Sequence, residues 1–409
     1  MDETLPLSAA MATVAAYKKM TELPLYQHAQ ALFFGLEQKD GDPPRLLSHY
    51  TDLFCSLASE GYSSLGQWFW DQLRYGEFPY GELVSSGGQN QPLQEAARQD
   101  IETFMRLSAY PCQRLKERMN QRFSSPWSEA AAALPEWETA VPFSFQSITD
   151  FYRESGSGMF ARYRAFVWNN RALTPVPQPD RPEPEDLIGY RLQREQVEEN
   201  TRTLLNGRRV NNILLYGDSG TGKSATVKSL LSIPGFEQLR LIEVQKNQLD
   251  TMPHLMRTLQ NKKQKFILFL DDLTFEANDN TPSILKSILE GGLELRPINT
   301  AIYATSNRRH LVREFFSERG REDEITADES IEEKTALSER FGIRIPYPSL
   351  TQAEYLELAE KLAEKSGLKL PKEKLHPLAL RWELYHQGRT PRTARQFITG
   401  LAASEHAML

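Results

Sequence analysis

One stretch constrains the fold more than any other: Asn211–Ser232, which reads NNILLYGDSGTGKSATVKSLLS. Its apolar run, Ile213–Tyr216, leads into Gly217–Ser224, and these eight residues fit the pattern G-x-x-x-x-G-K-[ST]. We name Gly217–Ser224 the phosphate loop. Glycines let such a loop curl so that successive backbone N–H groups point at phosphate oxygens. The alternative is a glycine-rich turn with an exposed lysine, but the apolar run before the loop and the helical pattern after it favour a nucleotide site.

Each position of this stretch has an expected task. Lys223 brings a positive charge to the β and γ phosphates, and the Ser224 hydroxyl is a ligand for Mg²⁺. A helix that begins near Gly222 presents its positive end to the same anion. The residues expected to bind the nucleotide here are Gly217, Asp218, Ser219, Gly220, Thr221, Gly222, Lys223, Ser224 and Ala225.

Composition narrows the class of protein. The chain has 409 residues, of which 40% are hydrophobic and 25% charged, with a net charge of −6, as in an ordinary soluble protein of two or three domains. Two cysteines, Cys55 and Cys112, without a C-x-x-C motif argue against a disulfide framework and a zinc site. No apolar run reaches the roughly 18 residues of a membrane span. We therefore expect a cytoplasmic protein without a membrane partner.

Residues 1–172 show helical periodicity and no catalytic motif, which predicts a mainly helical N-terminal domain that could bind a partner. Its aromatic residues could stack on bases, but a helical core explains them better. They are Trp68, Phe69, Trp70, Trp127, Trp137, Phe143 and Phe145. Residues 173–186 contain five prolines among charged residues, which predicts a stiff linker and a domain boundary.

The remainder alternates strand and helix patterns, which predicts an α/β fold over residues 187–350 and a helical lid over residues 351–409. Besides Ile213–Tyr216, the expected strands are Leu239–Val244, Phe266–Leu270, Thr300–Thr305 and Phe341–Ile345. The all-apolar run Phe266–Leu270 is typical of a central parallel strand. Leu187 and Ile188, which enter before the phosphate loop, are candidates to pack on the adenine base.

Polar residues follow two of these strands, at the edge where ligands bind in open α/β sheets. Asp271 is expected to hold Mg²⁺, and Asp272 to orient the attacking water. Asn307 offers an amide to the water or the γ-phosphate. A polar strand end without function is the alternative for all three.

Two arginines complete the candidate site. Arg340 precedes the last strand, from which it could reach the γ-phosphate bound by a neighbouring subunit and stabilise transition-state charge. Its alternative is a surface ion pair with the acidic segment from Glu318 to Glu333, which is itself either a solvated loop or a docking surface. Arg392 opens a late helix and is expected to contact phosphate from the lid, with Arg395 as the alternative.

With these motifs in place, the sequence resembles the AAA+ ATPases. The phosphate loop is similar to their Walker A motif, Phe266–Asp272 to Walker B, Asn307 to sensor 1, Arg340 to the arginine finger and Arg392 to sensor 2. The stretches around Arg340 and Arg392 resemble the Holliday-junction branch-migration motor. The phosphate loop, FLDDLTFE and YATSNRRHLV look more similar to a bacterial AAA+-like family described as a domain of unknown function. The resemblance implies a five-stranded parallel sheet with a helical C-terminal lid, ATP and Mg²⁺ as cofactors, and a homo-oligomer.

One residue departs from the AAA+ pattern. Asp272 stands where these proteins usually have glutamate, and its shorter side chain puts the rate of turnover in question more than binding. Two hypotheses follow: a Mg²⁺-dependent ATPase that remodels or loads a macromolecular partner, or a nucleotide-gated binding module with little turnover. A small-molecule kinase would have no evident use for Asn307, Arg340 and Arg392. A serine hydrolase is not supported, because the sequence contains no G-x-S-x-G motif. The partner, nucleic acid or protein, stays open.

Overall fold

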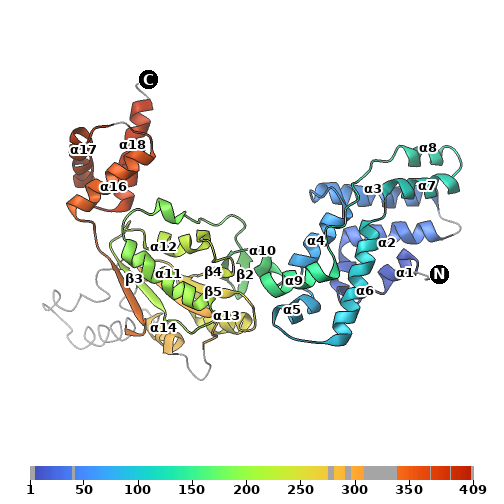
Figure 1. The fold of residues 1–409 in the computed structure, drawn as a ribbon, viewed down its shortest axis with the longest axis horizontal. Helices are drawn as coiled ribbons and strands as arrows, with labels where there is room; N and C mark the ends of the chain where they lie inside the picture. The colour runs from blue at the N-terminus through green and yellow to red at the C-terminus, as the bar shows by residue number, and fades with distance from the viewer. Residues whose placement is uncertain are drawn as a thin grey trace. The chain divides into compact units, whose positions relative to one another are not determined.

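The computed structural model describes residues 5–38, 42–274, 281–290, 296–307, 339–368, 370–386 and 388–406. The chain forms two compact units, Met1–Arg162 and Tyr163–Leu409, which are described separately below (Figure 1). The acidic segment from Glu318 to Glu333 lies outside the described residues. Within them, every helix is too short or too polar to cross a membrane.

The N-terminal unit is helical, as expected. Prolines begin several of its helices, because their fixed φ suits the first turn and their missing N–H has no partner there. Helix α2 starts at Pro24, and Pro111 lies between α6 and α7. The helices are α1 (Leu7–Ala12), α2 (Pro24–Glu37), α3 (Pro43–Ser59), α4 (Leu65–Tyr75), α5 (Pro79–Ser85), α6 (Gln91–Ser108), α7 (Cys112–Arg122), α8 (Trp127–Ala132), α9 (Phe145–Ser155) and α10 (Met159–Arg162), with a 3₁₀ turn at Lys18–Glu22.

Aromatic side chains form the core of this unit. Trp68 and Phe69 are buried, and the Phe69 ring stacks on Phe104 with centroids 4.7 Å apart. Trp137, Phe143 and Phe145 are also buried, whereas Trp127 is 39% exposed. The prediction that these aromatic residues pack a core is therefore confirmed for most of them, and Trp127 is the exception.

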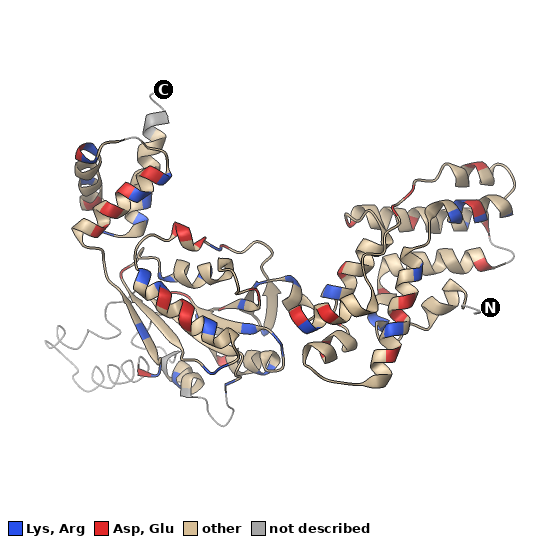
Figure 2. Cartoon of the chain, viewed as in Figure 1, with Lys and Arg blue, Asp and Glu red and all other residues tan. Residues whose placement is uncertain are grey.

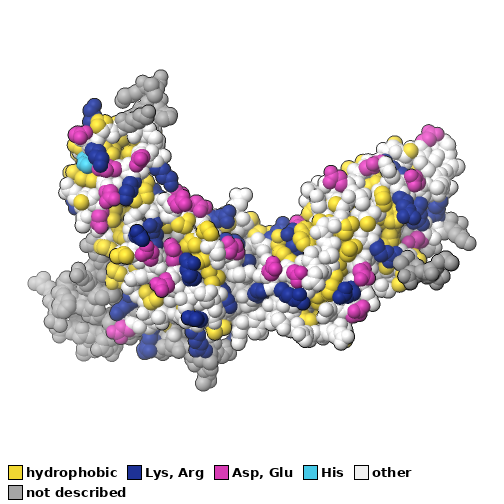
Figure 3. All heavy atoms as spheres, in the orientation of Figure 1, with side chains coloured by type: hydrophobic (Ala, Val, Ile, Leu, Met, Phe, Trp, Pro, Cys, Tyr) yellow, Lys and Arg dark blue, Asp and Glu magenta, His cyan; other side chains and the backbone are white. Residues whose placement is uncertain are grey.

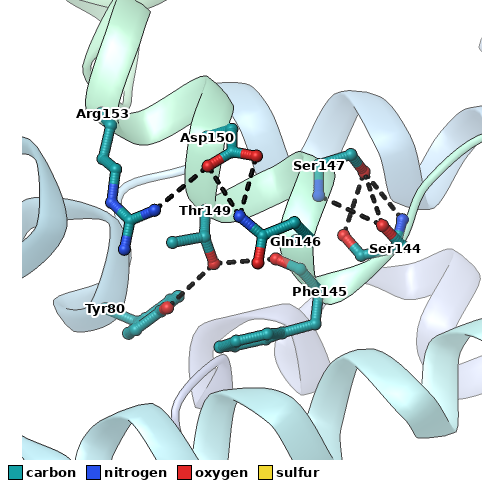
Figure 4. A network of polar contacts seen from close by, with 8 residues as sticks. All are labelled: Tyr80, Ser144, Phe145, Gln146, Ser147, Thr149, Asp150 and Arg153. Carbon is teal, nitrogen blue, oxygen red and sulfur yellow. Dashed lines mark hydrogen bonds and ion pairs between the residues drawn. The ribbon is translucent and has the colours of Figure 1, made fainter.

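Helix α9 shows how polar groups are satisfied inside the unit (Figure 4). The Ser144 side chain accepts a hydrogen bond from the backbone N–H of Ser147, and Ser147 Oγ accepts one from the backbone N–H of Ser144. This reciprocal cap satisfies donors that the first turn of a helix otherwise leaves free. One turn later, Thr149 Oγ1 donates to the Phe145 carbonyl and lies 2.9 Å from the Tyr80 hydroxyl.

The second unit is built on a seven-stranded sheet with strand order β2-β1-β4-β5-β6-β3-β7. All neighbours are parallel except β1 and β2. The predicted five-stranded parallel sheet is present as the contiguous set β4-β5-β6-β3-β7, but β1 and β2 extend it at one edge. The strands are β1 (Ala165–Asn169), β2 (Ala172–Pro175), β3 (Ile213–Gly217), β4 (Leu239–Val244), β5 (Lys265–Leu270), β6 (Thr300–Ser306) and β7 (Ile343–Tyr347).

These two extra strands move the boundary between the units. We expected a helical domain up to residue 172 and a linker over residues 173–186, but the second unit already begins at Tyr163. Phe166 and Trp168 are buried in β1. Asn170 and Arg171 adopt left-handed φ values of 49° and 59°, as in the tight turns that match the twist of a hairpin. Alternating aromatics before two consecutive residues suited to such a turn were the overlooked signal.

Helices cover the sheet and form a separate small cluster after β7 (Figure 1). This cluster is the predicted lid, packed around Tyr355, Leu358, Leu375 and Phe397. Its first helix begins with a capping box between Thr351 and Glu354. The helices of the unit are α11 (Arg191–Leu205), α12 (Lys223–Ser229), α13 (Met252–Leu259), α14 (Thr281–Glu290), α16 (Gln352–Lys365), α17 (Lys372–Tyr385) and α18 (Pro391–His406), with 3₁₀ turns at Pro184–Asp186, Leu230–Ser232 and Lys246–Thr251.

Charge is distributed rather than concentrated. Basic and acidic residues are interspersed along α16 (Figure 2). On the face drawn in Figure 3, Lys and Arg alternate with Asp, Glu and hydrophobic side chains in both units. That face therefore lacks the continuous basic surface with which proteins bind nucleic-acid backbones.

Candidate functional site

The phosphate loop connects β3 to α12, and three of its glycines have positive φ. The values are 140° at Gly217, 79° at Gly220 and 94° at Gly222, a region that other residues rarely adopt. At Gly217, a Cβ atom would lie 2.1 Å from the Tyr347 carbonyl oxygen on β7. The loop therefore starts where only glycine lets two backbones approach so closely.

Lys223 lies at the end of this loop, with its side chain buried. Its Nζ donates to the carbonyl oxygens of Gly217 at 3.0 Å and Asp218 at 2.7 Å. Burial lowers the pKa of Lys223 to about 8, although the carboxylates of Asp218, Asp272 and Asp271 oppose this effect. An anion beside this amine would restore a partner for its charge.

Asp271 joins three elements at the carboxyl edge of the sheet. It follows β5, and its Oδ1 accepts hydrogen bonds from Ser224 Oγ on α12 and from Thr305 Oγ1 on β6, both at 2.6 Å. Carboxylate and hydroxyl oxygens are the ligands that Mg²⁺ prefers. The donor atoms that meet at this point therefore fit the predicted metal.

Asp272 lies beside this cluster in a left-handed conformation with φ of 51°. Its N–H donates to Thr305 Oγ1 at 2.9 Å, and its Oδ1 accepts from Asn307 Nδ2 at 2.6 Å. The two residues predicted to manage the attacking water are thus hydrogen-bonded to each other.

Thr305 connects the two aspartates, and sequence reasoning missed it. The side chain is buried and contacts both Asp271 and the Asp272 backbone. Its place near the carboxyl end of β6, two positions before Asn307, was the available signal.

A pocket of about 500 Å³ lies beside these residues. The predicted members that line it include most of the phosphate loop, both candidates for the base, and the lid arginines. They are Leu187, Ile188, Ser219, Gly220, Thr221, Gly222, Lys223, Ser224, Ala225, Asp271, Asp272, Asn307, Arg392 and Arg395. Gly217 and Asp218 are not part of the lining, and their carbonyls instead hold Lys223. Arg340 is exposed and also lies outside the lining.

The lid meets the phosphate loop through the start of α18. The Arg392 backbone N–H donates to the Gly220 carbonyl at 3.2 Å. Thr390 precedes this helix, and its Oγ1 accepts from the Thr393 N–H at 3.2 Å. A Cβ at Gly220 would lie 3.0 Å from Thr390 Oγ1, so the loop and the lid are in close contact.

Tyr190 and Arg194 are among the pocket residues that were not predicted. The Tyr190 ring stacks on Tyr347 with centroids 4.9 Å apart. Arg194 Nη1 donates to the carbonyls of Pro184 and Leu187, which fixes the segment that carries Leu187 and Ile188. The only sequence signal was Gly189-Tyr190, a turn directly before a helix.

The mostly parallel sheet, the glycine loop after β3 and the helical lid form a P-loop fold of the AAA+ type. More specifically, the chain belongs to the family described as "Protein of unknown function (DUF815)", which matches residues 161–405. The prediction that the chain belongs to a family described as being of unknown function is thereby confirmed.

Comparison with solved structures gives more distant matches. The RuvB Holliday junction branch migration motor of Thermotoga maritima is 14% identical, with a TM-score of 0.37, over 56% of this chain and 67% of that one. The ORC1 protein of Aeropyrum pernix, solved in complex with DNA, is 18% identical, with a TM-score of 0.37, over 54% and 62%. Among curated proteins, no sequence matches this chain significantly.

Proposed function

We propose that the second unit binds ATP with Mg²⁺ and hydrolyses it, and that hydrolysis remodels or loads a macromolecular partner, with the chain acting as a homo-oligomer. The observation that carries the proposal is the hydrogen-bonded set of Ser224, Asp271, Thr305, Asp272 and Asn307 beside the buried Lys223. This set places metal-type oxygens, a carboxylate for water and a phosphate-binding amine around one pocket.

The chain's own groups would bind the triphosphate. The N–H groups of the phosphate loop and the start of α12 face the anion, and Lys223 exchanges its two backbone carbonyls for phosphate oxygens. Ser224 and Asp271 would hold Mg²⁺, which when bound neutralises charge on the β and γ phosphates. Leu187 and Ile188 offer apolar surface to the base, and Arg392 or Arg395 offers charge from the lid.

Asp272 and Asn307 would manage the attacking water. The carboxylate accepts a proton or a hydrogen bond from the water, and the amide holds the carboxylate in place, as it does at 2.6 Å. Thr305 fixes the backbone of Asp272, so the carboxylate is positioned without needing a longer side chain.

Arg340 is proposed to act on the γ-phosphate bound by a neighbouring subunit. It lies outside the pocket lining of its own chain and is exposed just before β7, where a second copy could bring it to a pocket. An arginine supplied in this way is worth roughly 10³-fold or more in turnover.

The test is steady-state phosphate release with Mg²⁺, alongside calorimetric ATP binding. We expect Asp272→Asn and Arg340→Ala to bind ATP normally and to lose turnover. Arg340→Lys is the matched control, because it keeps the charge but loses the planar fork. Turnover at the wild-type rate in Arg340→Ala would exclude its role in trans, and absence of ATP binding in the wild type would exclude the whole proposal.

The second candidate, a nucleotide-gated binding module, rests on Asp272 itself. Its side chain is one methylene shorter than glutamate, and its carboxylate is already engaged by Asn307. Tight ATP binding without phosphate release, even with a captured partner present, would favour this function. A pulldown with Asp272→Asn in ATP, compared with Lys223→Ala, tests whether protein or nucleic acid associates with the ATP state.

A further inference from the structure

A cluster of three possible metal ligands lies in the N-terminal unit, far along the sequence from the phosphate loop. His28 is on α2, and His49 and Asp52 are on α3. One ligand atom from each of the three lies within 4.8 Å of the other two. Among the described residues, these are the three or more His, Cys, Asp or Glu side chains that lie close enough together to share a metal ion.

Packing of α2 and α3 into the core fixes the backbone around this cluster. On α2, Leu25 and Leu32 are buried on either side of His28 in the sequence, one turn before and one turn after. On α3, Leu46 and Leu53 flank His49 at the same spacing. Residues at such spacings share one helix face, so each histidine lies on or beside a face that packs into the core. The backbone positions of the ligands are therefore set by packing.

The two imidazoles differ from the histidine of the lid in their contacts with the protein. Both histidines are half-buried, and within the described residues neither makes a hydrogen bond or an ion pair. His376 in the lid, by contrast, contacts Glu360 at 2.6 Å. Without protein partners, the ring nitrogens of these two imidazoles stay available as ligands.

The chemistry of the three groups selects the class of ion. Two imidazole nitrogens and one carboxylate oxygen, with an open position, are a donor set for Zn²⁺ and similar transition-metal dications. Four tetrahedral ligands at zinc distances lie about 3.4 Å from one another. The present separation of up to 4.8 Å must therefore shorten by about 1.4 Å, which side-chain rotation can supply because Asp52 is at least partly exposed.

Neighbouring groups both support and oppose a cation. Ser48 Oγ donates to Asp52 Oδ2 at 3.3 Å, a contact of the kind that orients ligating carboxylates. Arg45 lies one turn before His49 on α3. The charge of Arg45 repels a cation, but its long side chain can extend into solvent.

We propose that His28, His49 and Asp52 bind a single transition-metal dication of the zinc type, with water as the fourth ligand, and that the ion clamps α2 to α3. The scarcity of cysteine argued against a zinc site from the sequence, but that argument covers cysteine ligands only. Histidines 21 residues apart in the sequence, each on a different helix, give no recognisable motif.

The test is titration of full-length, chelator-treated protein with Zn²⁺ by calorimetry, in excess Mg²⁺ so that the oxygen cluster at Asp271 is occupied. We expect the wild type to bind one Zn²⁺ ion. The affinity for Zn²⁺ should fall roughly 100-fold or more in His28→Ala and in His49→Ala. Asp52→Asn, a substitution of a side chain that is at least partly exposed, should weaken binding while leaving the folded state intact. His376→Ala is the matched control, because it removes an imidazole outside the cluster.

Two results would overturn the proposal. One is Zn²⁺ binding of equal affinity in the wild type and all three cluster variants. The other is a wild-type affinity no tighter than that of His28→Ala, since the other side chains would then account for all binding. Thermal unfolding adds an independent readout, because Zn²⁺ should raise the Tm of the wild type and of His376→Ala but not of Asp52→Asn.

Discussion

The two ends of the sheet in the second unit both carry buried polar residues, but these residues have different partners. At the amino end, Asn212 Oδ1 accepts from the Ile302 N–H at 3.0 Å, and Asn299 Nδ2 donates to the carbonyls of Leu259 at 2.8 Å and Lys262 at 3.0 Å. Their partners are mostly backbone groups. The amino end is therefore closed by contacts that hold neighbouring segments together.

At the carboxyl end, side chains contact side chains and face a pocket. Ser224, Thr305 and Asn307 all donate to Asp271 or Asp272, and both aspartates are exposed. Such contacts can be exchanged for a ligand without breaking a strand. The comparison teaches that one end of the same strands stabilises the fold while the other is free to perform chemistry.

Lys223→Met should have the largest effect on activity, without an equal effect on stability. We expect phosphate release to fall roughly 100-fold or more, because the charge at the β and γ phosphates is lost. The Tm should not fall, since the folded-state pKa of about 8 lies below the ordinary value of 10.5 and the buried charge therefore opposes folding at neutral pH. A phosphate-release assay measures the turnover, and scanning calorimetry measures the Tm. A large drop in Tm would show that the pocket end also carries stability.

Asn299→Ala addresses the opposite end. It leaves the Leu259 and Lys262 carbonyls without their donor, which should lower the free energy of unfolding by about 2 kcal/mol. ATP affinity of the folded protein should not change. Asn307→Ala is the matched control at the pocket end, where turnover should fall and denaturant midpoints should stay the same. An exchange of these two phenotypes would contradict the comparison.

The pH dependence of ATP binding sharpens the role of Lys223. The anion favours the protonated amine, so its pKa in the complex should lie above the free value of about 8. Affinity should then be constant below pH 8 and fall up to tenfold per pH unit as pH rises above it, with proton uptake on binding. Titrations near pH 8.5 in buffers of different ionisation enthalpy detect that uptake. Lys223→Met should bind weakly with no such dependence.

Gly220→Ala should have the smallest effect. Its φ of 79° disfavours alanine, and the added Cβ would press on Thr390 and Arg392. We expect a loss of about 1 kcal/mol in stability and a several-fold loss in ATP affinity. Gly235→Ala is the control, because that glycine also has positive φ but an open surrounding. Equal ATP affinity in the two variants would show that contact with the lid does not matter to the pocket.

Local patterns were enough to predict much of this unit. The phosphate loop, the five predicted strands and the polar residues after β5 and β6 are each encoded within a few consecutive residues. What could not be predicted depends on distant contacts. Thr305 gains its importance from Asp271, and the addition of β1 and β2 to the sheet depends on pairing with β4. The contact of Arg392 with Gly220 likewise joins positions 172 residues apart.

The hydrogen bond between the Arg392 N–H and the Gly220 carbonyl gives α18 a mechanical property. The helix has 16 residues and is about 24 Å long, and one end is pinned to the loop. A tilt of about 5° around that pin moves the far end by about 2 Å. Small movements of the loop therefore produce larger movements at the C-terminal end of α18. A force applied at that end acts in turn on the loop.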